Sequence, residues 1–144
     1  MNSMTTVSDI MTRGVRYLSP ADSLDYAAQA MDELDVGAIP VCTGEKLVGM
    51  VTDRDIIVRA VAQGLATGET PLSAIMTNEV LCCREDQPVF EVMLAMGDAQ
   101  VRRMPVVDRN RNLVGIVSLG DIAVKTEDSK VAVALQEISE PAES

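Results

Sequence analysis

Residues 47–56 read LVGMVTDRDI, and residues 113–122 read LVGIVSLGDI. A second pair of segments repeats upstream, because SDIMT at residues 8–12 returns as SAIMT at residues 73–77. The upstream segments are 65 residues apart and the downstream segments 66. Repeats of about 20–50 residues are typical of open arrays, whereas this longer unit has the size of a small subdomain. The duplication therefore predicts two related subdomains that pair with each other.

The composition predicts an aliphatic core. Of the 144 residues 47% are hydrophobic, and the aromatic residues are Tyr17, Tyr26 and Phe90. This length allows one continuous core if the two copies share it, while each copy alone would be marginal. Apolar runs stay well below the roughly 20 residues of a membrane helix, and the N-terminus lacks a basic segment followed by an apolar one. We therefore expect a cytoplasmic protein without a membrane partner.

The charge pattern favours a small anionic ligand over a nucleic acid. The net charge is −10, whereas nucleic-acid binding is usually driven by a clustered basic face. Arg54, Arg59, Arg102 and Arg103 nevertheless lie near the repeated motifs. A local positive pocket on an acidic protein suits a small anion.

The residues that usually carry catalysis or bind metals are sparse. Cys42, Cys82 and Cys83 form no CxxC pair, and the chain contains no histidine. The odd number of cysteines does not suggest a secreted disulfide framework, so we expect free, buried or half-buried thiols. We find no metal-ligand cluster and no nucleophile with an evident base. The sequence therefore predicts neither catalytic residues nor a metal site.

The first copy predicts the order strand, helix, strand, strand, helix. Residues 15–18 are expected as a short strand, and Ser23 is expected to cap the following helix. Gly37 is expected to supply a left-handed residue at or soon after the end of this helix. Residues 38–42 and 46–51 are predicted as an antiparallel hairpin. The helical spacing rests on Leu24, Ala27, Ala28, Met31 and Leu34.

The second copy predicts the same order. A strand is expected at residues 80–83, followed by a helix from Pro88 through Met96. Gly97 is expected to let the chain leave this helix. Residues 103–107 and 113–117 are predicted as the second hairpin.

The predicted fold class is α/β (α+β), with tandem β-α-β-β-α units packed pseudo-symmetrically. The predicted boundaries place the first repeat at residues 7–62 and the second at residues 72–126. Residues 63–71 are polar and contain glycine and proline, so we predict a linker there. Residues 127–144 are predicted as a tail with a short helix.

These motifs together resemble the CBS domain. In the first copy the resemblance rests on DIMT at residues 9–12, GAIPV at residues 37–41 and LVGMVTDRD at residues 47–55. In the second copy it rests on RMPVVD at residues 103–108 and LVGIVSLGD at residues 113–121. The chain thus resembles a stand-alone CBS pair, or Bateman module, without an attached enzyme or transporter domain.

The resemblance implies regulatory binding of an adenosine-containing molecule, such as AMP, ADP, ATP or S-adenosylmethionine, in clefts between the repeats. It implies that Asp55 and Asp121 hold the ribose hydroxyls and that Thr52 and Ser118 lie near the phosphates. The ligand is regulatory, and the resemblance implies no required cofactor.

The resemblance also implies a wall for the purine, formed by the segments that end at Pro40 and Pro105. Ile39 and Met104 are the expected side-chain contacts.

The two sites are not expected to bind equally. The first motif offers a hydroxyl, two acids and the cation of Arg54, whereas the second replaces the charged pair with leucine and glycine. Arg103, with the preceding Arg102, is a candidate to compensate in the second site; the alternative is solvated charge before an edge strand.

Physical chemistry supports the assignment but leaves a structural alternative open. A carboxylate can accept two hydrogen bonds from vicinal ribose hydroxyls. However, Thr52-x-x-Asp55 and Ser118-x-x-Asp121 also match capping boxes, so helix capping explains each motif alone. The two prolines have an alternative role as strand-edge breakers.

Two further expectations concern partners. One is a homodimer through the apolar positions Ile56, Ile57, Ala60, Ile122 and Val124, although burial within the chain's own core explains these residues equally well. The other is a regulated partner protein that responds to the ligand. The alternative function is a CBS scaffold that binds no nucleotide and acts through protein interactions.

Overall fold

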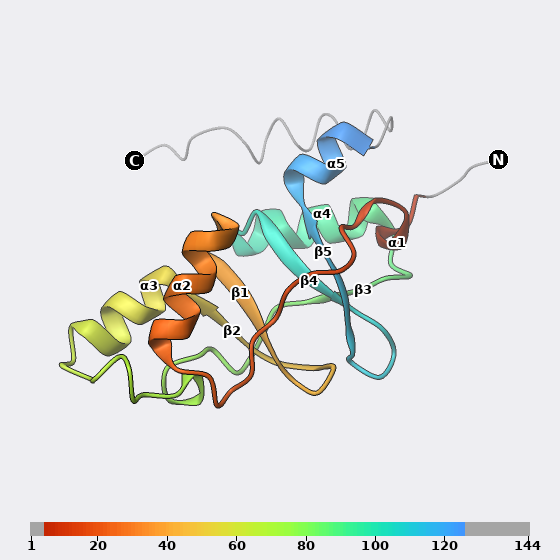
Figure 1. Ribbon diagram of the computed structural model, residues 1–144. Coiled ribbons are helices and arrows are strands. Elements are labelled where there is room, and N and C mark those ends of the chain that lie inside the picture. The colour runs from red at the N-terminus through yellow and green to blue at the C-terminus, as the bar shows by residue number, and fades with distance from the viewer. Residues whose placement is uncertain (1–4, 126–144) are drawn as a thin grey trace, which may run out of the picture. The chain divides into compact units, whose positions relative to one another are not determined.

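The computed structural model describes residues 5–125, which divide into two compact units (Figure 1). The first-repeat unit contains residues 16–80 and 111–113. Within the described residues, the second-repeat unit contains residues 5–15, 81–110 and 114–125. The predicted tail helix in residues 127–144 lies outside the described part of the chain.

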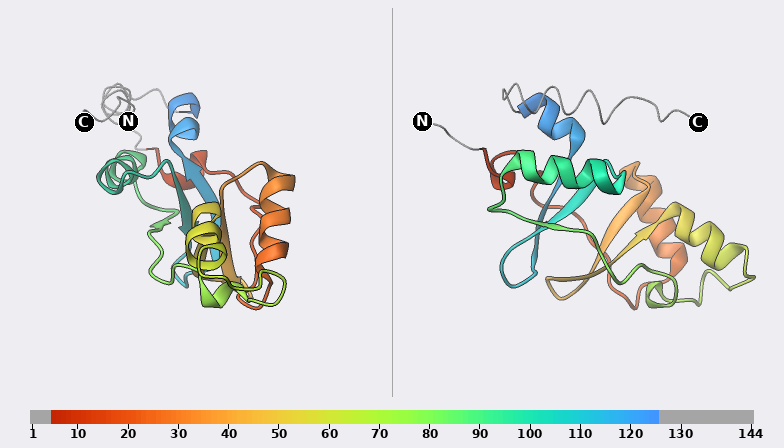
Figure 2. Two further views of the ribbon diagram at one scale, coloured as in Figure 1. Left: turned by 90° about the vertical axis from the view of Figure 1, so that its left-hand side faces the viewer. Right: turned by 180° about the vertical axis from the view of Figure 1, so that it is seen from behind.

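The first-repeat unit is built on an antiparallel hairpin. Strand β1 (Ala38–Thr43) pairs with β2 (Lys46–Thr52), so that Ala38 lies opposite Thr52 and Ile39 opposite Val51. Helix α2 (Leu24–Leu34) contacts β1 and the short helix α3 (Asp53–Ile56) (Figure 2). A π-helical segment η1 (Ile57–Val61) continues α3. A 3-10 turn η2 (Leu72–Ala74) completes the elements.

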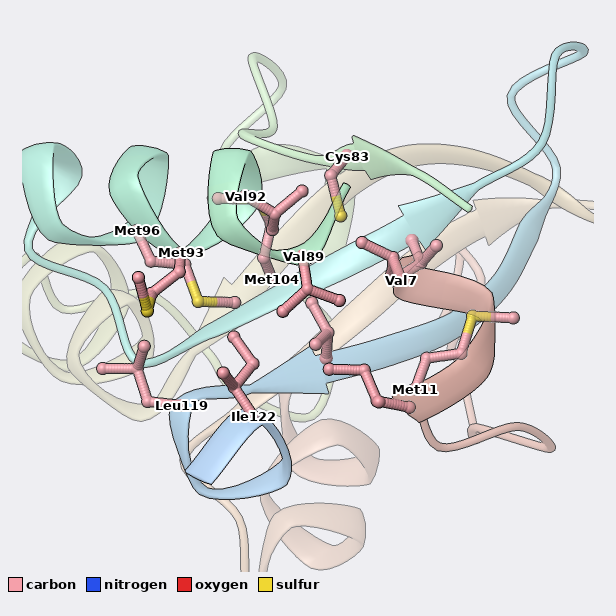
Figure 3. Packing of buried hydrophobic residues seen from close by; sticks show 13 residues of the cluster. Val7, Met11, Cys83, Val89, Val92, Met93, Met96, Met104, Leu119 and Ile122 are labelled. Atoms are coloured by element: carbon pink, nitrogen blue, oxygen red, sulfur yellow. The ribbon is translucent and has the colours of Figure 1, made fainter. Parts of the chain in front are cut away.

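The second-repeat unit has a three-stranded sheet with the order β3-β4-β5. Strand β3 (Cys83–Arg84) runs parallel to β4 (Arg103–Val107), and β5 (Leu113–Ser118) lies on the other side of β4. Its buried cluster is aliphatic and rich in methionine, as the close view in Figure 3 shows for Met11, Met93 and Met96. Its helices are α1 (Val7–Ile10), α4 (Val89–Ala99) and α5 (Leu119–Lys125).

The segment that leads each repeat packs into the unit of the other repeat. Val7 and Ile10 of α1 belong to the core of the second-repeat unit, and the Val7 amide donates to the Gln87 carbonyl at 3.0 Å. Leu72 and Ile75 correspondingly belong to the core of the first-repeat unit. Each compact unit therefore combines the body of one repeat with the leading segment of the other.

Equivalent backbone pairs hold both leading segments. Thr12 exchanges two amide-to-carbonyl bonds with Ile116, at 2.8 and 3.0 Å. Thr77 exchanges two bonds with Met50, at 2.9 and 3.0 Å. We call residues 7–12 and 72–77 the exchanged segments.

The ends of the two long helices differ from the prediction. The left-handed residue after α2 is Asp35 (φ 55°) rather than the predicted Gly37, and α4 passes through Gly97 to end before the left-handed Gln100 (φ 59°). Helix α4 therefore runs three residues beyond the predicted Met96 to Ala99. The prediction was wrong because glycine is only the commonest left-handed residue, and polar side chains also adopt this conformation.

Two other local predictions need correction. Residues 15–18 form no strand: Leu18 makes a single bridge to Val41. The buried residues of α2 are Leu24, Ala27, Ala30 and Met31, whereas the predicted Ala28 and Leu34 are exposed. The cap was predicted correctly, since the Ser23 hydroxyl accepts a hydrogen bond from the Tyr26 amide at 3.1 Å.

Candidate ligand-binding site

The first motif lies where β2 gives way to α3. The Thr52 hydroxyl accepts a hydrogen bond from the Asp55 amide at 3.0 Å, and Asp55 Oδ2 accepts one from the Thr52 amide at 3.0 Å. These reciprocal bonds form a complete capping box. Both residues are half-buried. The cap leaves Asp55 Oδ1 and the hydroxyl proton of Thr52 outside this pair of bonds.

The second motif repeats this geometry between β5 and α5. The Ser118 hydroxyl accepts from the Asp121 amide at 3.0 Å, and Asp121 Oδ2 accepts from the Ser118 amide at 3.2 Å. A capping role is thus observed for both motifs. In each motif the capping bond uses one carboxylate oxygen and leaves the second oxygen outside it.

A cation lies beside that second oxygen in both motifs. Arg59 Nε is 3.7 Å from Asp55 Oδ1, and Lys125 Nζ is 3.7 Å from Asp121 Oδ1. Neither Lys125 nor Arg59 is among the site residues predicted from the sequence. The signal was present, because a basic residue follows each aspartate by four positions, a spacing that places both on one helix face.

The predicted purine wall lies beside the motifs in each unit. Ile39 pairs with Val51, next to Thr52, but its side chain is 2% exposed and belongs to the core. Met104 is 1% exposed and belongs to the core of its own unit. Contact of these two side chains with a purine therefore stays a prediction.

The prolines do not break the strands that contain them. Strand β1 continues through Pro40, whose carbonyl accepts the Leu18 amide at 3.0 Å. Strand β4 continues through Pro105, and β4 is the central strand of its sheet. Neither proline therefore ends its strand, although β1 is an edge strand of its two-stranded sheet, where a residue without an amide donor is tolerated. Both prolines are buried.

The candidate arginines are exposed. Arg54 lies on α3 directly before Asp55, and Arg103 opens β4. The Leu119 amide donates to the Arg102 carbonyl at 3.0 Å, so the start of β4 lies beside the second motif. The backbone of Arg103 therefore lies near Ser118. Within residues 5–125, no contact between the Arg103 side chain and the second motif is observed.

A separate pocket of about 400 Å³ lies at the other end of the second-repeat sheet. It is found at the last residues of the parallel strands β3 and β4, Arg84 and Val107, whereas Ser118 lies near the start of β4. Arg84 is paired there with Asp86 at 3.2 Å. None of the predicted site residues lines it. The lining residues are Thr6, Ser8, Arg84, Glu85, Asp86, Val107, Asp108 and Arg109.

The thiols are free. Burial raises the pKa of Cys42 to about 11, and burial, with a smaller effect of the neighbouring Cys82, raises that of Cys83 to about 12. Such thiols are poor nucleophiles and poor metal ligands at neutral pH, because the thiolate is the reactive form. Within residues 5–125, no group of three or more metal-ligating side chains is present.

Comparison with known proteins gives the family. The model of the CBS domain matches residues 7–61 and residues 72–128. The chain belongs to the CBS domain family. It carries two such domains in tandem, which confirms the predicted CBS pair and its mixed α/β fold.

The relatives include stand-alone CBS proteins of similar length. CBS domain-containing protein YhcV of Bacillus subtilis is 43% identical over 129 residues, which cover 90% of this chain and 91% of YhcV. Hypoxic response protein 1 of Mycobacterium tuberculosis is 35% identical over 139 residues, which cover 96% of each chain. These two relatives match this CBS pair over nearly their whole length.

Two solved structures carry information on ligands. Hypoxic Response Protein I, with two coordinated zinc ions, has a TM-score of 0.78 and 37% identity, covering 85% of this chain and all of that one. The CBS domain pair of protein MJ0100, in complex with 5'-methylthioadenosine and S-adenosyl-L-methionine, has a TM-score of 0.71 and 32% identity. That match covers 83% of this chain and 98% of the other.

No helix within residues 5–125 is long and apolar enough to cross a bilayer.

Proposed function

We propose that this CBS pair is a non-catalytic regulatory module that binds an adenosine-containing molecule through Asp55, Asp121 or both. The observation that carries the proposal is the split use of each carboxylate. Oδ2 is held by the capping bond to the backbone, and Oδ1 is directed toward a cation 3.7 Å away rather than into the backbone. A carboxylate fixed in this way is preorganised to accept ribose hydroxyls.

The MJ0100 complex supports the ligand class. That CBS pair binds two adenosine derivatives, neither of which contains a phosphate: 5'-methylthioadenosine is a neutral thioether and S-adenosyl-L-methionine is a sulfonium. In this chain the first motif adds the exposed cation of Arg54, whereas the second has Leu119 and Gly120 at the corresponding positions. We therefore expect a phosphorylated ligand such as AMP, ADP or ATP to prefer the first motif, with Thr52 near the phosphates.

The regulatory step follows from linkage. A ligand can shift the module between two conformations only if its affinity for them differs, and a partner protein then responds to the favoured one. We further propose a homodimer as the responding assembly. Of the five residues predicted for its face, Ile56, Ala60 and Ile122 are buried in the chain's own cores, while Ile57 and Val124 are 59% and 82% exposed.

Asp55 is also part of a helix cap, and this decides which variant tests the proposal. Asp55→Ala removes both the cap and the ribose acceptor, so it lowers the melting temperature even without ligand. Asp55→Asn is the discriminating variant, since its amide oxygen can still accept the Thr52 amide while the second acceptor is lost.

We would measure melting temperatures of wild type, Asp55→Asn and Asp121→Asn with AMP, ADP, ATP and S-adenosylmethionine. A ligand at about 100 times its Kd adds about 2.7 kcal/mol, which raises the melting temperature of a chain this size by roughly 9 °C, given an unfolding entropy of about 2.1 cal/mol/K per residue. We expect a rise in wild type that is lost in one or both Asn variants. No rise with any of the four ligands would favour the alternative, an interaction scaffold without nucleotide binding.

A further inference from the structure

Arg59 and Lys125 each join two features that the proposed function leaves separate. Besides facing Asp55, Arg59 Nη1 donates to the Ile75 carbonyl at 3.2 Å. Ile75 lies in the exchanged segment that leads the second repeat. One guanidinium thus holds the candidate ligand-binding carboxylate of the first repeat and the leading segment of the other.

The second-repeat unit contains the same arrangement with a different cation. Lys125 Nζ faces Asp121 and donates to the Ile10 carbonyl at 3.2 Å. Ile10 occupies the position in SDIMT that Ile75 occupies in SAIMT. Lysine and arginine form different hydrogen bonds, so their shared feature here is a positive charge placed between a carboxylate and a carbonyl.

The π-helical segment η1 contains Arg59, which lies one turn beyond Asp55. π-helical turns are rare and occur frequently at functional sites. Arg59 is 53% exposed at its side chain, whereas Asp55 is 15% exposed. Because the carboxylate is largely shielded from water, solvent screens this pair less than a fully exposed ion pair, so the pair is stronger, although still modest.

We propose that Arg59 and Lys125 are positioning residues that couple each ligand-binding aspartate to the exchanged segment of the other repeat. This inference rests on the proposed function for the identity of the ligand. A ribose that bonds Asp55 fixes the carboxylate, the carboxylate fixes the cation, and the cation holds the Ile75 carbonyl. Fixing the Arg59 side chain costs conformational entropy only once. Ligand binding and attachment of residues 72–77 therefore favour each other.

The coupling has a direction along the chain. The exchanged segment held beside Asp55 continues through residues 78–82 into β3 of the second repeat. Occupation of the first-repeat motif therefore acts on the segment that leads into the second repeat, and the converse holds for Asp121 and residues 7–12. The two cations are thus placed to carry information from one repeat to the other.

The test measures amide hydrogen exchange by NMR on the full chain without ligand. The reporters are the Met76 amide, which donates to the Leu72 carbonyl at 2.8 Å, and the Met11 amide, which donates to the Val7 carbonyl at 2.9 Å. Arg59→Met keeps an unbranched apolar stem and removes the charge. We expect it to speed exchange at Met76 by about 3–10-fold and to leave Met11 unchanged, since a partly exposed charge-assisted contact is worth about 1 kcal/mol.

Lys125→Met is the matched control, and it should speed exchange at Met11 and leave Met76 unchanged. Arg59→Lys should restore the slow exchange at Met76, because the second unit already uses lysine. Asp55→Asn should also speed exchange at Met76. If Asp55 and Arg59 act through one contact, the double variant should exchange at Met76 no faster than Arg59→Met alone. Equal exchange at Met76 in wild type and Arg59→Met would overturn the proposal.

A second arm adds ATP, and then S-adenosylmethionine, as probes. Binding of either probe should slow exchange at Met76 or Met11 in wild type. In Arg59→Met, the slowing at Met76 should be lost. Binding without a change at either amide would overturn the coupling. If neither probe binds while the ligand-free results hold, the proposed function fails and the link between aspartate and exchanged segment stands.

Discussion

Asp55 and Asp121 illustrate how one side chain serves both the fold and a candidate site. Each carboxylate caps a helix through one oxygen and faces a cation through the other. The sequence left capping and ligand binding as alternatives, because spacing alone does not tell which oxygen is used. The structure shows which oxygen makes the capping bond. Asn and Ala substitutions therefore have different expected effects, because Asn can keep that bond and Ala cannot.

The buried thiols give a prediction at the same scale. The pKa of Cys42 is raised to about 11 and that of Cys83 to about 12, from 9.0. The folded state therefore binds these protons more tightly than the unfolded state, and the stability that this contributes is full below about pH 9 and lost as the pH rises through 11–12. We expect the free energy of unfolding to fall above about pH 9, by at most about 1.4 kcal/mol per pH unit for each thiol.

Urea unfolding at several pH values checks this, with Cys83→Ala as the reference. The variant should be less stable than wild type at neutral pH and should lose stability less steeply in the alkaline range. Parallel pH profiles for the two proteins would show that Cys83 does not contribute to the alkaline loss.

At the scale of elements, both repeats use a glycine to let the exchanged segment approach a strand. A Cβ on Gly49 of β2 would lie 2.8 Å from Met76 Sδ and 3.0 Å from the Thr77 carbonyl oxygen. A Cβ on Gly115 of β5 would lie 2.8 Å from Met11 Sδ and 2.7 Å from the Thr12 carbonyl oxygen. The glycine in each LVG motif is therefore required by packing.

Gly115→Ala should lower the free energy of unfolding by about 1–3 kcal/mol, because the backbone of Thr12 cannot yield as a flexible side chain can. Gly120→Ala is the control: its Cβ would meet Ser118 Oγ at an ordinary 3.6 Å, and alanine favours the helix by up to about 1 kcal/mol. Denaturant titration of both variants distinguishes them. A Gly115→Ala protein as stable as wild type would show that the strand and the exchanged segment can separate slightly at no cost.

For the whole molecule, the exchanged segments mean that neither repeat completes its core from its own contiguous chain. Ile10 is 2% exposed in the second-repeat unit, and Ile75 is 3% exposed in the first-repeat unit. A mutation in the leading segment of one repeat should therefore destabilise the body of the other.

Ile10→Ala and Ile75→Ala form a matched pair for testing this. Each should cost about 2–5 kcal/mol by leaving a cavity. Hydrogen exchange should accelerate mainly in α4 and β5 for Ile10→Ala, and mainly in α2 and β1 for Ile75→Ala. Acceleration in the repeat that contains the mutation, rather than in the other repeat, would contradict the exchange of segments.

The sequence by itself determined the duplicated plan. Periodicity and turn residues placed both long helices and both hairpins to within a few residues, because these patterns reflect local geometry. The Ser/Thr-x-x-Asp motifs were found for the same reason, since a capping box is formed within four residues. Helix ends were less accurate, as Asp35 and Gln100 show, because more than one residue type adopts the left-handed conformation.

Only the tertiary structure decided which repeat each leading segment completes and what Arg59 and Lys125 contact. The carbonyls that they bond lie 16 and 115 residues away in the chain, distances at which no local spacing rule applies. SDIMT and SAIMT are so alike that either could pack against either repeat on sequence grounds. The choice depends on the packing and backbone pairing of the complete fold, which the sequence specifies only through contacts between distant residues.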